Sequence, residues 1–168
     1  MASAQKFLGM YRGTVISNVD PEGAGRLQLK VPAVLGAKES MWAARCIPLA
    51  GKGKGAYFVP EVGDEVLVAF ANGDARAPIV LGSLWNAGDA PPEATASDPS
   101  AVMTVASKGR HSMVIRDTPG PLSGILVKSA SGAMILVNDL AITIDNGKGA
   151  SIVLEGPNVM VNGKPLAL

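Results

Sequence analysis

The 168-residue chain carries 15 Lys and Arg against 14 Asp and Glu, so it lacks the strong positive field with which proteins attract nucleic acid or anionic membranes. Hydrophobic residues make up 48% of it, which argues against disorder, while 20 Gly and 12 Pro favour many short strands joined by turns. The apolar runs are far too short for a membrane-spanning helix, and the single Cys46 excludes an intramolecular disulfide.

The N-terminal residues predict a cytoplasmic product and then a β-hairpin. Residues 1–9 lack a basic start followed by a long apolar stretch, so we expect synthesis in the cytoplasm without a signal peptide. Alternating apolar side chains predict a long first strand over residues 11–19. Residues 20–25, Asp-Pro-Glu-Gly-Ala-Gly, have turn composition, and residues 27–31 alternate again.

A third strand is predicted over residues 41–49. Alternation puts Trp42, Ala44 and Cys46 on one face, so we expect Cys46 in the core, where free cysteines often pack. The next loop, residues 50–55, contains the run Gly-Lys-Gly-Lys-Gly. It lacks the spacing of a phosphate-binding loop and is interpreted as a flexible or hub-contacting loop.

Two more strands complete a predicted barrel. Apolar side chains alternate over residues 65–70, and Asn72-Gly73 is a strong signal for a type I′ turn because both residues tolerate positive φ. The turn leads into a fifth strand over residues 77–85. Five short strands with a long first one predict a small closed barrel of the oligonucleotide-binding (OB) type over residues 1–86.

The composition changes after the barrel. Residues 87–101 are rich in Ala, Pro, Asp, Glu and Ser without apolar periodicity, which predicts a linker. Beyond it, residues 107–117, 129–139 and 146–156 repeat one pattern of a glycine turn, a strand and a second turn. The repeat predicts a stalk of β-strands over residues 102–168.

Six predicted stalk strands carry two apolar residues at positions i and i+2, which places each pair on one face. The pairs are Met113 and Ile115, Ile125 and Val127, Met134 and Leu136, Ile142 and Ile144, Ile152 and Leu154, and Val159 and Val161. A ladder of short strands cannot bury such a stripe by itself, so we expect these residues to form the core of an oligomer. Periodicity does not give the number of copies.

Motifs along nearly the whole chain carry a family resemblance. They are Gly13-Thr14-Val15, Asn18-Val19-Asp20-Pro21, Gly25-Arg26-Leu27, Val31-Pro32, Trp42, residues 60–70, Gly73-Asp74, residues 78–86, Ser131-Gly132 and Lys148-Gly149. With them the chain resembles baseplate assembly protein V of contractile phage tails and the spike region of type VI secretion valine-glycine repeat proteins. The resemblance implies an all-β protein, an N-terminal OB-fold barrel followed by a C-terminal trimeric β-prism or β-helix stalk.

The same resemblance implies a structural role without catalysis or cofactors. The expected protein is a homotrimeric central spike, assembled into the baseplate of a phage tail or phage-tail-like particle and attached there to a hub protein. Sheath contraction would drive it into the target cell envelope, which it contacts only mechanically. A tip protein of the Pro-Ala-Ala-Arg (PAAR) type would bind the C-terminal end, for which Val161, Leu166 and Leu168 are the candidate residues.

Three features of related spikes have no counterpart in this sequence. The linker, residues 87–101, is too short for the muramidase domain that some relatives carry there. The lone His111 cannot form the His-x-His iron site of some phage spikes, so no metal is expected and a surface or turn role is favoured. The hub-forming domain of longer type VI proteins is also missing, and we expect another chain to supply it.

Two other classes of function remain open at this stage. OB folds often bind single-stranded nucleic acid, but such sites need stacking aromatics along a basic groove. Here the aromatic residues are interpreted as core; they are Tyr11, Trp42, Tyr57, Phe58, Phe70 and Trp85. An envelope-degrading enzyme would need a catalytic constellation, and the adjacent Asp64 and Glu65 point to opposite faces of a strand.

Overall fold

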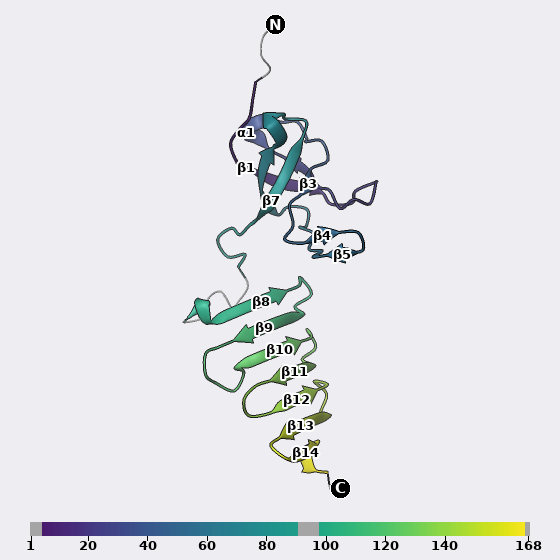
Figure 1. Cartoon of the computed structure of the whole chain (residues 1–168), viewed down its shortest axis with the longest axis vertical. Helices are drawn as coiled ribbons and strands as arrows, with labels where there is room; N and C mark the ends of the chain where they lie inside the picture. The colour runs from purple at the N-terminus through teal and green to yellow at the C-terminus, as the bar shows by residue number, and fades with distance from the viewer. Residues whose placement is uncertain (1–4, 91–97, 167–168) are drawn as a thin grey trace. The chain divides into compact units, whose positions relative to one another are not determined.

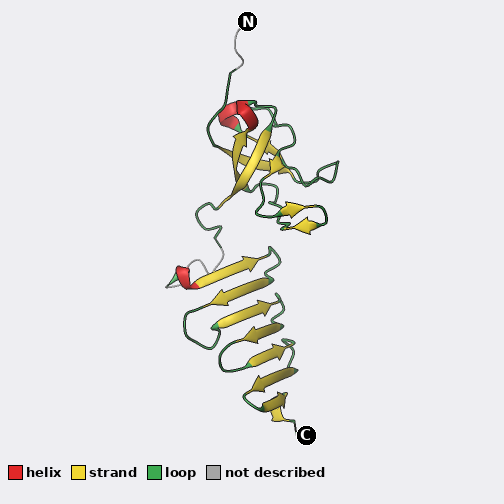
Figure 2. Cartoon of the chain, in the orientation of Figure 1, coloured by secondary structure: helices red, strands yellow, loops and turns green. Residues whose placement is uncertain are grey.

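The computed structural model describes residues 5–90 and 98–166, and the chain divides into two compact units, Met1–Asp89 and Ala90–Leu168 (Figures 1 and 2). Strands dominate both units, and the predicted all-β class is confirmed.

The N-terminal unit is a curled five-stranded sheet with the order β2-β1-β6-β7-β3. These strands are β1 (Tyr11–Ser17), β2 (Gln28–Lys30), β3 (Ala44–Arg45), β6 (Glu65–Phe70) and β7 (Pro78–Leu84). Neighbours are antiparallel except β3, which runs parallel to β7. Leu27 and Ala43 exchange two backbone hydrogen bonds, of 3.0 and 2.7 Å, between the two ends of the sheet. This bridge makes the sheet an OB-type barrel, as predicted.

Short elements complete this unit. They are the helix α1 (Pro32–Leu35), the hairpin of β4 (Ala50–Gly51) and β5 (Lys54–Gly55), and the 3-10 turn η1 (Ala71–Gly73). Asn72 and Gly73 have φ values of 53° and 73°, so the turn residues behave as predicted. The hairpin loop is longer than two residues because the ladder between β6 and β7 stops at Phe70 and Pro78.

The barrel core follows from alternation. Inward-facing side chains with at most 5% exposure are Val15, Leu27, Leu29, Val31, Ala43, Val66, Val68, Phe70 and Val80. Gly13 is buried where β1 crosses this core, and an added Cβ there would lie 3.0 Å from a Val68 methyl group and 3.1 Å from the Lys30 carbonyl. Only a residue without a side chain lets the strands approach so closely.

The prediction for the third strand is wrong in extent and in phase. Only Ala44–Arg45 form a strand, and the buried residue is Ala43, which pairs with Leu27. Cys46, predicted in the core, is exposed because the phase is shifted by one residue. Its backbone N–H still donates to the Val80 carbonyl at 2.7 Å.

Three aromatic residues that were interpreted as core lie on the surface. Tyr57 is 72% exposed, Phe58 65% and Trp85 69%. Tyr57 and Phe58 follow β5 in the connection to β6, and Trp85 comes directly after β7. They lie outside the alternating strands, so strand periodicity gives no reason for burying them.

The C-terminal unit is an eight-stranded antiparallel meander in which every strand pairs with its sequence neighbours (Figure 1). A 3-10 turn, η3 (Pro99–Ala101), precedes it. The strands are β8 (Val102–Ala106), β9 (Ser112–Arg116), β10 (Gly124–Lys128), β11 (Met134–Val137), β12 (Ile142–Asp145), β13 (Ser151–Glu155), β14 (Asn158–Val161) and β15 (Lys164–Pro165).

The repeated motifs are the turns of this meander. Between β12 and β13, the Asn146 side-chain oxygen accepts hydrogen bonds from the N–H groups of Lys148 at 2.8 Å and Ala150 at 3.0 Å. Between β14 and β15, Asn162 and Gly163 both have positive φ, 50° and 72°, as a type I′ turn requires. Each repeat thus stops one strand and starts the next in the opposite direction.

Candidate assembly surface

Strand register gives the C-terminal sheet one continuous apolar face. It consists of two columns of side chains that run across strands β8 to β14. One column contains Met103, Ile115, Ile125, Val137, Ile142, Leu154 and Val159. The other contains Val105, Met113, Val127, Ile135, Ile144, Ile152 and Val161. We call these residues the apolar face.

No described residue of the C-terminal unit covers the apolar face. Most of its side chains are exposed, from 38% at Val161 to 64% at Met103. An apolar surface that extends over seven strands is larger than monomeric soluble proteins usually show, and such surfaces mark contacts with other proteins. The face is therefore the strongest candidate for assembly among the described residues.

Two residues predicted in the trimer core lie on the opposite face. Met134 pairs with Lys128 and Asp145, and Leu136 pairs with Leu126 and Thr143. Residues 134–137 are four consecutive apolar residues, so alternation has no phase there, and the pairing with β10 and β12 decides it. Ile135 and Val137 take the predicted places. The other ten predicted residues share the apolar face, while their role in a trimer core stays a prediction.

Met103 and Val105 belong to the apolar face but were missed. They have the same i, i+2 spacing in β8 as the predicted pairs, with Thr104 between them. No glycine turn precedes β8, so the repeat pattern did not include it. The spacing alone could have found them.

The opposite face of the sheet contains a small buried cluster in strands β9 to β11. Val114, Leu126 and Leu136 are 3 to 7% exposed, and Val102 and Met134 pack against them. In β12 to β14 the same central column continues with Thr143, Val153 and Met160, which are half-buried. This face therefore has a small core of its own in strands β9 to β11.

The last strand pair holds two of the three candidate tip residues. Val161 ends β14 opposite Lys164, and the Leu166 N–H donates to the Val159 carbonyl at 2.8 Å. Leu166 is 52% exposed. Leu168 lies outside the described residues.

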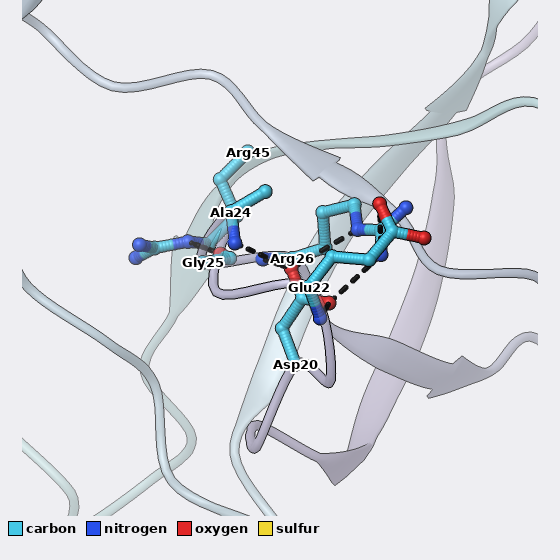
Figure 3. A network of polar contacts seen from close by, with 6 residues as sticks. All are labelled: Asp20, Glu22, Ala24, Gly25, Arg26 and Arg45. Carbon is cyan, nitrogen blue, oxygen red and sulfur yellow. Dashed lines mark hydrogen bonds and ion pairs between the residues drawn. The ribbon is translucent and has the colours of Figure 1, made fainter.

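A network of hydrogen bonds fixes the loop between β1 and β2 (Figure 3). The Asp20 carboxylate accepts from the N–H groups of Glu22, Ala24 and Arg26 at 3.0 to 3.1 Å, and from the Arg26 guanidinium at 2.8 and 3.0 Å. Glu22 adds an ion pair to Arg26 at 3.1 Å. The hydrogen bonds from Arg26 hold the pKa of Asp20 well below its usual range.

Arg45 ties this loop to the segment before β6. Its guanidinium donates to the carbonyls of Gly25 and Phe58 and lies 5.3 Å from the ring centre of Tyr57. Asn18 adds a bond to the Pro60 carbonyl at 3.0 Å. Arg45 therefore holds the Tyr57 ring and the backbone at Phe58.

Over residues 5–90 and 98–166, no group of three or more His, Cys, Asp or Glu is arranged to hold a metal ion. His111 is exposed in a turn, where its Nδ1 accepts from the Ala130 N–H at 3.4 Å. None of the helices within those ranges is long and apolar enough to cross a membrane.

Comparison with known families agrees with the two units. Residues 11–85 match the OB domain of the type VI secretion system and phage-baseplate injector, and residues 102–167 match the C-terminal trimerisation domain of phage baseplate V. No curated protein matches the chain in a sequence search. The fold and both matches define a baseplate component of contractile injection machines. The chain belongs to the baseplate V spike family and carries its trimerisation domain.

Proposed function

We propose that the chain is the structural central spike of a contractile injection system or phage tail, a homotrimer that attaches to the hub and is driven into the target envelope. The uncovered apolar face on a matched trimerisation domain is the observation that carries this proposal. The role is mechanical, since a fully hydrogen-bonded β-structure with a close-packed interior transmits force without bending.

Burial of the apolar face supplies the driving force for assembly. Full burial of an aliphatic side chain contributes roughly 1.5–3 kcal/mol, and these side chains are about half exposed in one chain. About 1 kcal/mol per residue thus remains to be gained. Cyclic symmetry closes three such faces around one axis and leaves no site for further growth.

The proposed division of labour follows the sequence. The barrel, residues 1–86, forms the collar on the hub; residues 87–101 are the linker; and residues 102–168 form the spike. The barrel loops that Arg45 connects support hub attachment, because exposed aromatic residues in fixed positions are typical of binding surfaces. We further propose that a PAAR-type tip protein covers the exposed end at Val161, Leu166 and Leu168.

Two measurements test the spike function. Sedimentation velocity of the full chain should give a trimer, and the hub protein from the same gene cluster should co-purify with it. A compact monomer at micromolar concentration would contradict the trimer. A trimer that does not retain the hub would contradict attachment alone.

The tip proposal has its own test. The tip protein encoded nearby should be captured by the full chain and lost with a chain truncated after Gly156, which lacks β14 and β15. Equal capture by both chains would place the tip site elsewhere, and capture by neither would contradict the proposed partner.

Binding of single-stranded nucleic acid is a second candidate, favoured by one observation. Tyr57 and Phe58 are exposed beside the hairpin that carries Lys52 and Lys54, and base stacking needs such rings. Fluorescence anisotropy with a labelled oligonucleotide would show salt-dependent binding if this function exists.

A further inference from the structure

The charged residues that the structure describes in the C-terminal unit lie at strand ends and in turns, and their signs are largely segregated. In a meander, successive turns alternate between two margins of the sheet (Figure 1). The basic margin contains the turns after β8, β10, β12 and β14, with Lys108, Arg110, Lys128, Asp145, Lys148 and Lys164. The acidic margin contains the start of β8 and the turns after β9, β11 and β13, with Asp98, Arg116, Asp117, Asp139 and Glu155.

Contacts within the chain do not account for this segregation. On the basic margin, the side chains of Arg110, Lys128, Lys148 and Lys164 are exposed and have no ion pair or hydrogen bond among the described residues. The same holds, over the described part of the chain, for three side chains of the acidic margin, Asp117, Asp139 and Glu155. Both margins therefore present unpaired charge to the surroundings.

We propose that the basic margin of one copy lies against the acidic margin of the next copy in the cyclic assembly. The inference rests on the proposed trimer and deepens it. A rotation about an axis along the strand stack brings each sheet beside its neighbour with unlike margins together, which is a heterologous contact. The partner of each margin is thus a second copy of this chain, recognised by charge complementarity.

The heights of the charges fit this arrangement. Cyclic symmetry places equivalent strands of the copies at the same position along the symmetry axis. Within one sheet, successive turns lie alternately on the basic and the acidic margin. Each acidic turn then lies between two basic turns of the neighbour, as Glu155 does between Lys148 and Lys164. One strand step is about 4.8 Å, shorter than the screening length of about 8 Å at physiological ionic strength. Salt at physiological concentration therefore does not fully screen the attraction between the two margins.

Charge also decides between two ways of burying the apolar face. Two sheets could cover each other face to face with strand stacks in opposite directions. The two-fold axis that relates them would run parallel to the strands. It would place the basic margin of one copy against the basic margin of the other, and the acidic margin against the acidic margin. Like charges at equal height repel, so the margins favour parallel copies around one axis.

A charge-reversal series on the full chain tests the proposal. Asp139→Lys/Glu155→Lys gives both margins a net positive charge. The trimer dissociation constant is then measured by sedimentation at 20 mM and 500 mM NaCl. At low salt we expect a trimer dissociation constant at least about tenfold higher than that of the unchanged chain, with a smaller difference at high salt. Adding Lys148→Glu/Lys164→Glu places a carboxylate on each side of position 155 and should bring the dissociation constant back toward that of the unchanged chain.

A matched control separates margin pairing from net charge. Asp139→Lys/Glu155→Lys combined with Lys38→Glu/Lys52→Glu, both in the N-terminal unit, has the original net charge but two basic margins. The trimer dissociation constant of this variant should stay as high as that of the chain with only Asp139→Lys/Glu155→Lys. Rescue by this distant compensation, or a reversed chain as tightly associated as the original at low salt, would overturn the proposal while leaving the trimer intact. A monomeric unchanged chain would overturn the proposed function as well.

Discussion

Asp20 shows how one side chain can organise a loop. Five donors, three of them backbone N–H groups, converge on its carboxylate and replace the regular ladder that the loop between β1 and β2 lacks. Sequence composition predicted the turn but not this network, because Arg26 comes back to Asp20 only through the fold of the loop.

The Asp20 network predicts a pH-dependent stability. The pKa of Asp20 is depressed in the folded chain, so its stabilisation is complete above the unfolded pKa of about 4 and is lost as pH falls below it. Asp20→Asn should lower the urea midpoint of the barrel transition at pH 7, and the difference from the unchanged chain should shrink below pH 4. Glu39→Gln, at an exposed site of the same unit, is the control. A constant difference across pH would contradict the role of the Asp20 charge.

A second prediction at this scale concerns the apolar face. Ile144→Asp would bring three carboxylates together at one level of the proposed trimer, where they are neither solvated nor paired. We expect at least a hundredfold loss of trimer affinity at pH 7, measured by sedimentation. The adjacent Thr143→Asp lies on the opposite face and should leave association nearly unchanged. The reverse order of effects would show that the other face points inward.

At the scale of elements, the predictable parts are those with local signals. Alternation and glycine turns located β1, β6, β7 and most of the C-terminal ladder. The predicted phase of the third strand was wrong because it depends on the pairing of Ala43 with Leu27, which is not a neighbour in sequence. The predicted face of the side chains in β11 was wrong because four consecutive apolar residues fit either phase of alternation. Register between strands is a nonlocal property, and periodicity within one strand cannot supply it.

Close backbone approach gives a prediction for strand β10. Gly124 has φ +96°, and an added Cβ would lie 2.2 Å from the Val137 carbonyl oxygen. Gly124→Ala should separate the ends of β10 and β11 and destabilise the folded assembly by roughly 2–4 kcal/mol. Gly156→Ala also has positive φ but meets open space, so it should cost about 1 kcal/mol. Equal thermal midpoints for the two variants would contradict the steric argument.

At the scale of the whole molecule, the two units differ in how they bury apolar surface. The barrel closes around nine buried residues, whereas the C-terminal sheet buries three and leaves its larger apolar face open. Family membership agrees with the fold predicted from the motifs, because those motifs mark turns and core positions that any member of the family needs. The segregation of charge onto two margins is visible only once the strand topology is known.

This difference predicts separate folding behaviour. Residues 1–86 expressed alone should fold as a β-rich monomer, while residues 102–168 should fold only on association, with a thermal midpoint that rises with concentration. Circular dichroism at 1 and 100 μM checks both fragments. An unfolded barrel fragment, or a C-terminal fragment whose midpoint is independent of concentration, would contradict the prediction.

The antiparallel meander also restricts how the length of this unit can change. Removing or adding a single strand would reverse the direction of all later strands, exchange the two margins below that point and break the alternation of signs. Removing or adding a hairpin preserves direction, face and margin. Chains built on this plan should therefore differ in length by even numbers of strands, in steps of about 10 Å along the stack.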